Sequence, residues 1–454
     1  MRGHRTRAAA AALVALALLG SACSSRDDDD ATTSGDESES EGAAESSIDT
    51  ADCIDDPTVP IEGDTVKLVS SYPQSGATAA FAEIARGWES YFEKVNDEGG
   101  VEIAGESYQI EYEDMDDEYN PAETAANLDE MVPAGSDVFA VFSVVGTANN
   151  LAIRDQLGEL CVPNVFAATG SPAWGNEDYP WTLGSSLSPY PLEGSMFASL
   201  LEDEKPDATV AMLVQDDDFG RAYEEGFAQA IEGTDIEVVK VERYQTGSAD
   251  VSAQITSLAD TDADAFFNGG TLLACPDALS RAKEAGWEPI TWVSTTCTSQ
   301  TLMGIAQDAG DGVYSAGNLK DPLNPDWDED EAMVEYLDTV RQYRPEGFLE
   351  TNAIVGYGYT QAAIFIEALE AAEEPTRLAL MESVRNLEVS DAGLLLPGVT
   401  VSTSEGDPYF GETLQLLQYE FTGPDDRNHF VPTGDLVDFE GETVEVTPED
   451  LING

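Results

Sequence analysis

Short apolar runs alternate with helical stretches along most of the chain after residue 64. The runs Val138–Phe142 and Val210–Val214 are apolar along their whole length, and the segments that follow them have helical spacing. A continuously apolar strand is buried on both faces, which is typical of a parallel sheet covered by helices. The alternation therefore predicts an α/β fold built from doubly wound parallel sheets.

The alternation occurs in two runs, which are separated by the segment between Pro180 and Pro191. A further helix, expected over Asn352–Ala372, follows the second run. We therefore expect two lobes, with a chain that crosses between them more than once. The expected limits are residues 64–184 plus about 319–400 for lobe 1, and residues 185–318 plus about 401–454 for lobe 2.

The first residues have the pattern of a bacterial export signal. A basic start precedes the apolar run Ala8–Leu19, which is too short to span a bilayer. The run is followed by Gly20-Ser21-Ala22-Cys23, which resembles a lipobox in which glycine replaces the usual leucine. We expect a signal peptide over residues 1–22 and a lipid on Cys23. The alternative is ordinary cleavage after Ala22, with Cys23 free or disulfide-bonded. The protein would then be exported, and either anchored to the outer face of the cell membrane or periplasmic.

Acidic residues dominate the chain. Residues 23–63 are rich in Asp, Glu and Ser, so we expect a disordered acidic tether. Over the whole sequence 89 Asp and Glu stand against 20 Lys and Arg, a formal charge of -69, which excludes a nucleic-acid partner held by phosphate neutralisation. The acidic surface is consistent with saline surroundings or with a field that concentrates a cationic ligand.

Two histidines, His4 and His429, are too few for a His-rich metal cluster. We expect no metal and no cofactor. A catalytic Ser-His or Cys-His pair would have to use His429, which follows a polar run. A hydrolase with paired carboxylates stays open as an alternative, although no acidic motif recurs at the strand ends. We therefore do not expect an enzyme.

Four cysteines besides Cys23 indicate disulfides in an exported protein. Cys275 opens a helical stretch and Cys297 follows an expected strand, so both would lie at the carboxyl edge of a parallel sheet. That pairing leaves Cys53 to bond Cys161. Four cysteines allow three connectivities, and the other two stay open.

Two loops that follow expected strands consist of small and hydroxylated residues. One is Ser143–Ala148, with Gly146 and Thr147, and the other is Ala167–Pro172, which begins Ala167-Ala168-Thr169. In open parallel sheets, ligands bind beyond the carboxyl ends of the strands, beside helix N-termini. Both loops suit an anion of carboxylate size, and neither has the spacing of a phosphate or dinucleotide motif. Tight turns without a ligand are the alternative.

Several short motifs follow one another along the chain from about Thr65 onward. They are Pro73-Gln74-Ser75-Gly76, Gly87, the run from Val95 to Val101, Asp114–Asp117, Pro163, Ala167-Ala168-Thr169, the run from Asp216 to Gly220, Ala285-Gly286-Trp287, and Gly356-Tyr357-Gly358-Tyr359. In this order the sequence resembles the type I periplasmic solute-binding proteins of the branched-chain amino acid class. The resemblance implies a monomeric receptor that delivers a small solute to an ABC permease.

The resemblance also implies binding residues. In the first lobe, Thr147, the backbone of Ala168 and Thr169, and the Thr169 hydroxyl would hold a ligand carboxylate. Ala80 or Phe81 would form the floor of the side-chain pocket. Phe219 and Leu272 would form the wall of the second lobe, and Tyr359 would reach in from the crossover helix. Gly146, Ala167 and Thr296 complete the expected site. For Phe219 and Tyr359, a purely structural role is the alternative.

One departure from the family pattern concerns the ligand. Relatives that bind amino acids commonly carry an acid after the strand that corresponds to Ile290–Ser294, but here the stretch reads Thr295-Thr296-Cys297-Thr298. Either another acid, such as Asp216 or Glu193, pairs with a ligand ammonium, or the ligand has no amino group. We expect a branched-chain or other amino acid, an amide or a small carboxylate. A lipid-anchored sensor with a signalling partner is the alternative to a transport receptor.

Overall fold

Five strands form the first sheet of the computed structural model, which describes residues 48–344, 350–404 and 406–443. Their order is β2-β3-β1-β4-β5, and β1 pairs in parallel with both β3 and β4. The strands are β1 (Thr65–Tyr72), β2 (Val101–Ile103), β3 (Glu106–Asp116), β4 (Ala140–Phe142) and β5 (Asn164–Val165). The expected signal peptide, Cys23 and the first part of the tether lie outside the described residues.

Seven strands form the second sheet, in the order β14-β13-β10-β9-β8-β6-β7. They are β6 (Thr209–Gln215), β7 (Glu237–Tyr244), β8 (Ala265–Gly269), β9 (Ile290–Val293), β10 (Tyr314–Gly317), β13 (Thr413–Glu420) and β14 (His429–Asp438). His429 is therefore the first residue of an edge strand. A small third sheet pairs β11 (Glu388–Val389) with β12 (Val401–Ser402).

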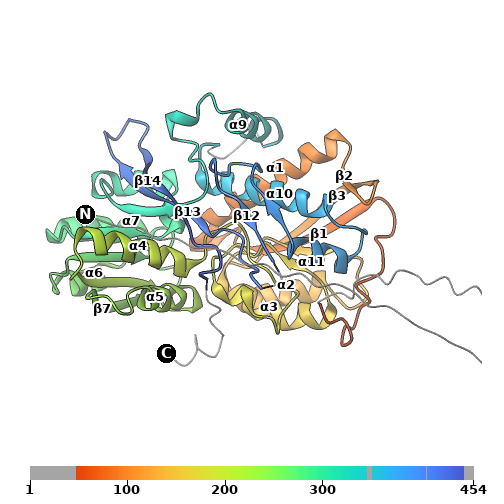
Figure 1. Ribbon diagram of the computed structural model, residues 1–454, viewed down its shortest axis with the longest axis horizontal. Coiled ribbons are helices and arrows are strands. Elements are labelled where there is room, and N and C mark those ends of the chain that lie inside the picture. Colours follow the sequence, from red (N-terminus) through yellow and green to blue (C-terminus); the bar gives the residue numbers. More distant parts are fainter. Residues whose placement is uncertain (1–47, 345–349, 405, 444–454) are drawn as a thin grey trace, which may run out of the picture. The chain divides into compact units, whose positions relative to one another are not determined.

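Eleven helices surround the sheets in the described ranges (Figure 1). They are α1 (Ala82–Glu98), α2 (Pro121–Met131), α3 (Thr147–Leu160), α4 (Tyr190–Glu204), α5 (Asp218–Ala230), α6 (Ser252–Ala259), α7 (Ala274–Ala285), α8 (Gln300–Ala306), α9 (Glu331–Tyr343), α10 (Ala353–Glu370) and α11 (Arg377–Val384). Among the described residues, no helix combines the length and the apolar character that a membrane span needs.

Both faces of each sheet are covered, which explains the continuously apolar strands. On β6, Val210, Met212 and Val214 lie in the core beneath α4 and α5. The residues between them, Ala211 and Leu213, lie in the opposite core beneath α6 and α7. Successive side chains of a strand point to opposite faces, so every residue of such a strand is apolar.

The sheets are mixed, not wholly parallel as expected. β2 pairs with β3 antiparallel across the turn Ala104-Gly105, in which both residues have positive φ, 51° and 84°. β13 and β14 extend the second sheet in the antiparallel direction. Strands joined by a short turn pair antiparallel, because a parallel pair needs a longer crossover connection.

Three chain segments that link the two sheets lie against one another. The Asn318 amide donates a hydrogen bond of 2.8 Å to the carbonyl oxygen of Ser186, and the Leu396 N–H donates one of 2.9 Å to the carbonyl oxygen of Asn318. A Cβ at Gly411 would lie 2.7 Å from the same Ser186 oxygen, so a larger residue would separate the segments. The chain therefore crosses between the sheets repeatedly, as expected. The exact lobe limits near residues 184 and 318 stay a prediction.

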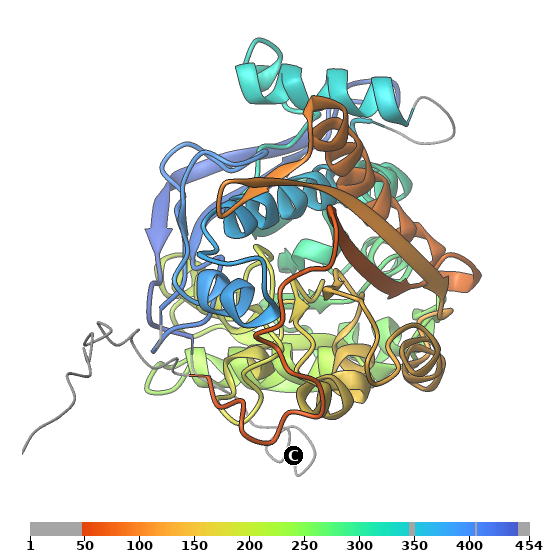
Figure 2. The ribbon, with the colours of Figure 1, turned by 90° about the vertical axis from the view of Figure 1, so that its right-hand side faces the viewer.

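The N-terminal part of the described chain is fixed to the first sheet's helices, although we expected a tether as far as residue 63. The Ile54 N–H donates to the Glu159 carbonyl of α3, and the Ile61 N–H donates to Pro375 before α11. A disulfide joins Cys53 to Cys161 at the end of α3. This segment is red in Figure 2. The second disulfide joins Cys275 to Cys297, so both expected pairs are present.

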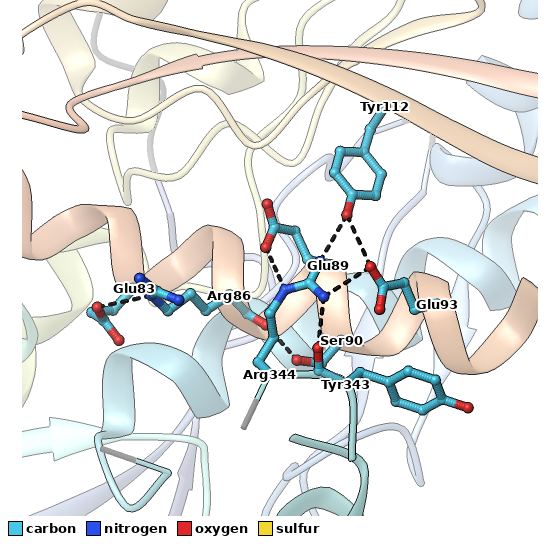
Figure 3. Close-up of polar contacts among 8 residues, drawn as sticks. All are labelled: Glu83, Arg86, Glu89, Ser90, Glu93, Tyr112, Tyr343 and Arg344. Carbon is cyan, nitrogen blue, oxygen red and sulfur yellow. Dashed lines mark hydrogen bonds and ion pairs between the residues drawn. The ribbon is translucent and has the colours of Figure 1, made fainter. Parts of the chain in front are cut away.

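Helix α9 is attached to α1 through an arginine at its C-terminal end (Figure 3). The Arg344 guanidinium contacts Glu89 Oε2 at 2.7 Å and Glu93 Oε1 at 2.8 Å, and it donates to the Tyr112 hydroxyl at 2.8 Å. The side chains of Arg344 and Glu89 are each 18% exposed, so water screens their attraction only weakly. The pair therefore holds α9 in place.

Replacing Arg344 by methionine is expected to lower the free energy of unfolding by about 2 to 3 kcal/mol, because two carboxylates would keep their charges without a partner. The control is Arg281→Met, since Arg281 is 42% exposed and pairs with Glu284 on the surface. We expect the control to cost less than about 1 kcal/mol. Urea unfolding of both variants measures the difference, and equal losses would contradict the assignment.

Candidate functional site

A cavity of about 150 Å³ lies between the elements of the two sheets. From the first sheet's side, Phe81 and Tyr119 line it, together with Gly146 and Ala168. From the second sheet's side come Tyr190, Phe219 and hydroxyl residues between Thr271 and Ser299, and α10 adds Tyr357. The end of β10 and the crossover segment that follows it, residues 316–321, also line the cavity. Each lobe therefore contributes one wall of a shared cavity.

Aromatic rings lie on both walls. The rings of Phe81 and Tyr119 stack at 6.0 Å with an interplanar angle of 26°. Across the cavity the rings of Tyr190 and Phe219 meet edge to face at 5.1 Å. The Tyr190 hydroxyl donates to Thr169 Oγ1 at 3.2 Å, and the Tyr357 hydroxyl lies 2.6 Å from Ser185 Oγ. These protein contacts leave mainly ring surface for a ligand.

The hydroxyl residues after β9 are held from behind by a buried acid. Glu193 of α4 is fully buried, and its carboxylate accepts hydrogen bonds from the Tyr223 hydroxyl at 2.7 Å, the Thr295 hydroxyl at 2.9 Å and the Thr295 N–H at 3.1 Å. Thr295 lines the cavity, whereas Glu193 does not. Glu193 therefore positions the loop and does not itself face the cavity.

Part of the expected binding site lines this cavity. The expected residues that do so are Phe81, Gly146, Ala168, Phe219 and Thr296. They come from loops or helix ends that follow β1, β4, β5, β6 and β9. The carboxyl ends of the strands therefore supply the cavity residues, as the architecture of open parallel sheets requires.

The other expected residues are buried elsewhere. Thr147 and Thr169 are buried, and their hydroxyls bond each other at 2.6 Å. Ala167 packs with Ala173 and Trp174. Leu272 lies in the core cluster formed mostly by the first sheet and its helices, so it joins the two lobes but does not line the cavity.

Tyr359 lies on the face of α10 that is turned away from the cavity. Its ring packs edge to face against Tyr91 at 4.9 Å and Tyr336 at 5.1 Å. Tyr357 lines the cavity in its place. Residues two apart on a helix point to nearly opposite sides, so only one tyrosine of the Gly356–Tyr359 motif can face the cleft.

The comparisons with known proteins agree with this arrangement. Residues 65–420 match the family described as "Periplasmic binding protein". The chain is a periplasmic binding protein. It is 23% identical over 365 residues to the leucine-, isoleucine-, valine-, threonine- and alanine-binding protein of Pseudomonas aeruginosa. The aligned residues cover 79% of this chain and 89% of the relative.

Solved structures share the fold of this periplasmic binding protein. A branched-chain amino acid ABC transporter protein from Thermus thermophilus with bound valine has a TM-score of 0.71 at 19% identity, and covers 83% of this chain and 97% of its own. A fatty acid ABC transporter substrate-binding protein from Thermomonospora curvata has the same TM-score and identity, and covers 85% and 95%. The family and the periplasmic binding protein-like I fold expected from the sequence are confirmed.

Sequence reasoning about this periplasmic binding protein missed three cavity tyrosines. Tyr119 follows β3 and the Asp114–Asp117 motif, and it has a positive φ of 62°. Tyr190 begins α4 after the first crossover, and Tyr357 stands beside the expected Tyr359. The position of Tyr119 just beyond a strand's carboxyl end was a usable signal, whereas nothing in the sequence marked Tyr190.

Three carboxylates of this periplasmic binding protein come together away from the cavity. Oxygens of Asp407, Glu412 and Glu440 lie within 4.8 Å of one another. The Glu412 carboxylate accepts hydrogen bonds from the Gly441 N–H at 2.9 Å and the Thr443 N–H at 3.2 Å. These bonds fasten the chain after β14, which gives the buried acid a structural role.

Glu193 gives this periplasmic binding protein a pH-dependent stability. Burial raises the pKa of the Glu193 carboxyl to about 7 from 4.5, although the hydrogen bonds from Tyr223 and Thr295 act in the opposite direction. Between these values the unfolded chain has lost the proton that the folded chain keeps, so stability falls as the pH rises from about 4.5 to 7.

We expect the free energy of unfolding of the wild type to fall between pH 5 and pH 8 relative to that of Glu193→Gln, by an amount on the order of 3 kcal/mol. Subtracting the variant's free energy of unfolding from that of the wild type at each pH removes the contribution of the other acids, including Glu412. Urea unfolding at several pH values measures the difference. A difference that stays constant over this range would contradict the assignment.

Proposed function

We propose that this periplasmic binding protein is the extracytoplasmic receptor of an ABC importer and that it closes on a small solute between its lobes. The observation that carries the proposal is the cavity between two aromatic walls, one from each lobe. A solute that touches both walls stabilises the closed arrangement by its differential contacts, and a membrane permease then recognises that form. The protein acts as a monomer without chemical conversion of the solute.

The crossover segments support this mechanism. Polar side-chain contacts join the lobes beside the cavity: Thr351 Oγ1 lies 2.8 Å from Gln300 Oε1, and the Tyr190 hydroxyl lies 3.2 Å from Thr169 Oγ1. The contacts among Ser186, Asn318 and Gly411 keep the crossovers together, so bending there would open the walls without separating the lobes. The cavity residues in this proposal are Phe81, Tyr119, Gly146, Ala168, Tyr190, Phe219, Thr296 and Tyr357.

The candidate solutes are an amino acid, an amide or a small carboxylate. Among the relatives, the Thermus protein is described with bound valine and the Thermomonospora protein as a fatty acid binder. A carboxylate would lie at the N-terminal end of α3 beside Gly146, where backbone N–H groups have no partner within the helix. Export and a lipid on Cys23 would keep the receptor at the outer face of the membrane.

Thermal unfolding in the presence of a panel of amino acids, amides and small carboxylates tests the proposal. A solute at about 100 times its dissociation constant should add about 2.7 kcal/mol to the free energy of unfolding. Phe81→Ala should weaken binding of the active solute at least tenfold. Phe421→Ala, which changes a phenylalanine that does not line the cavity, should leave binding unchanged. A flat response to every class of solute would count against the receptor function.

A further inference from the structure

We infer that the solute carries no ammonium group and has a compact apolar body. This inference rests on the proposed receptor function and narrows its substrate class. It follows from the lining of the cavity, in which every charge of the described residues already has a partner within the protein.

The acids in and behind the cavity wall already accept hydrogen bonds from protein groups. Asp321 is the one acid among the described lining residues, and its carboxylate accepts from the Leu323 N–H at 2.9 Å and the Phe430 N–H at 3.4 Å. Glu193 accepts three hydrogen bonds behind Thr295. Asp217 caps α5 through the Gly220 N–H and also accepts from Thr246, and it does not line the cavity. Each of these carboxylates therefore already accepts hydrogen bonds from the protein.

The hydroxyls after β9 do not replace a carboxylate. Thr295 donates its hydroxyl to Glu193, Thr296 to the Gly270 carbonyl at 3.0 Å, and Thr298 to the Thr295 carbonyl at 2.8 Å. Each oxygen can still accept one hydrogen bond, but none carries a charge. Burying an ammonium against them would leave its charge uncompensated, which is strongly unfavourable.

The basic residue of the lining is also paired. Lys320 Nζ lies 2.7 Å from Asp330 Oδ1, and its ammonium stands 5.4 Å from the centre of the Trp327 ring. The remaining surface consists mostly of rings and aliphatic groups, among them Ile84 and Ile354. An apolar cavity of about 150 Å³ is large enough to hold benzene. The cavity therefore selects for a compact apolar body.

Matched pairs of solutes test the inference by isothermal titration calorimetry on the wild-type protein. The pairs are leucine with 4-methylpentanoate and its amide, and phenylalanine with 3-phenylpropanoate and its amide; choline serves as a cationic probe for the aromatic walls. The inference predicts that at least one amine-free member binds 30-fold or more tightly than its amino acid. An amino acid or choline that binds as tightly as the amine-free solutes would overturn the inference and leave the receptor function standing. If no solute in this set or the wider panel binds, the receptor function itself fails.

A pair of substitutions tests whether the absence of a carboxylate in the cavity wall causes the preference for solutes without an amino group. Thr296→Asp places a carboxylate in the cavity wall, and Thr296→Asn is the uncharged control of nearly the same shape. The aspartate variant should shift the affinity ratio of leucine to 4-methylpentanoate at least tenfold toward leucine, and the asparagine variant should not. Equal ratios in two folded variants would contradict the inference, and the wild-type ratio decides it if the aspartate variant does not fold.

Discussion

Replacing Gly358 by alanine is expected to lower the free energy of unfolding by about 4 kcal/mol or more. Gly358 of α10 faces α1, and a Cβ at this position would lie 1.9 Å from the carbonyl oxygen of Ile84. Gly87 of α1 has the reciprocal constraint, because its Cβ would lie 2.1 Å from the carbonyl oxygen of Val355. Backbone atoms cannot rotate away as a side chain can, so the two helices would have to separate.

Gly158→Ala is the matched control for this substitution. Gly158 lies in α3, and a Cβ there would have no atom within 4 Å. Alanine favours the helix over glycine by about 0.5 to 1 kcal/mol, so the control should be slightly stabilising. Urea unfolding followed by far-UV circular dichroism measures both variants. A Gly358→Ala protein with wild-type stability would show that α1 and α10 are not in backbone contact.

Removal of the Cys53–Cys161 disulfide is expected to have the second large effect. This bond joins residues 108 apart in the sequence, whereas Cys275–Cys297 joins residues 22 apart. A cross-link restricts the unfolded chain more when it closes a longer loop, so the double serine variant of the first pair should lose about 4 to 5 kcal/mol. The double serine variant of the second pair should lose about 3 kcal/mol.

The test is which of the two double serine variants loses more free energy of unfolding. Urea unfolding of both double variants under oxidising conditions gives the two free energies. The segment that carries Cys53 is also held through Ile54 and Ile61, so residues 48–63 should become sensitive to proteases when the first bond is absent. A greater loss from the shorter loop would contradict the account.

The sequence was most informative where one physical constraint acts alone. Strands such as Val210–Val214 must be apolar on both faces, so β6 and the helices around it could be placed before the structure was known. The glycines of the family motif were recognisable, but their reason is tertiary: Gly87 and Gly358 lie where two distant helices touch. The antiparallel strands β13 and β14 could not be predicted, because a partly exposed edge hairpin has no continuous apolar run.

The candidate site was only partly predictable for a related reason. The strand-end argument places Gly146, Ala168 and Phe219 at the right edge, but it does not tell which side chain turns into the cavity and which turns into the core. The hydroxyls of Thr147 and Thr169 hydrogen-bond each other. The Tyr359 ring packs against the rings of Tyr91 and Tyr336. Such choices depend on contacts between residues far apart in the sequence.

A crystal structure of the protein with the tightest-binding solute of the panel tests the central claim most directly. The account predicts one solute molecule in the cavity, in contact with Phe81 and Tyr119 on one wall and with Tyr190 and Phe219 on the other. Its polar groups should lie toward Gly146, and none of them should form an ion pair with a carboxylate of the protein. Density for the solute outside this cavity, or contact with the residues of one lobe alone, would contradict the account.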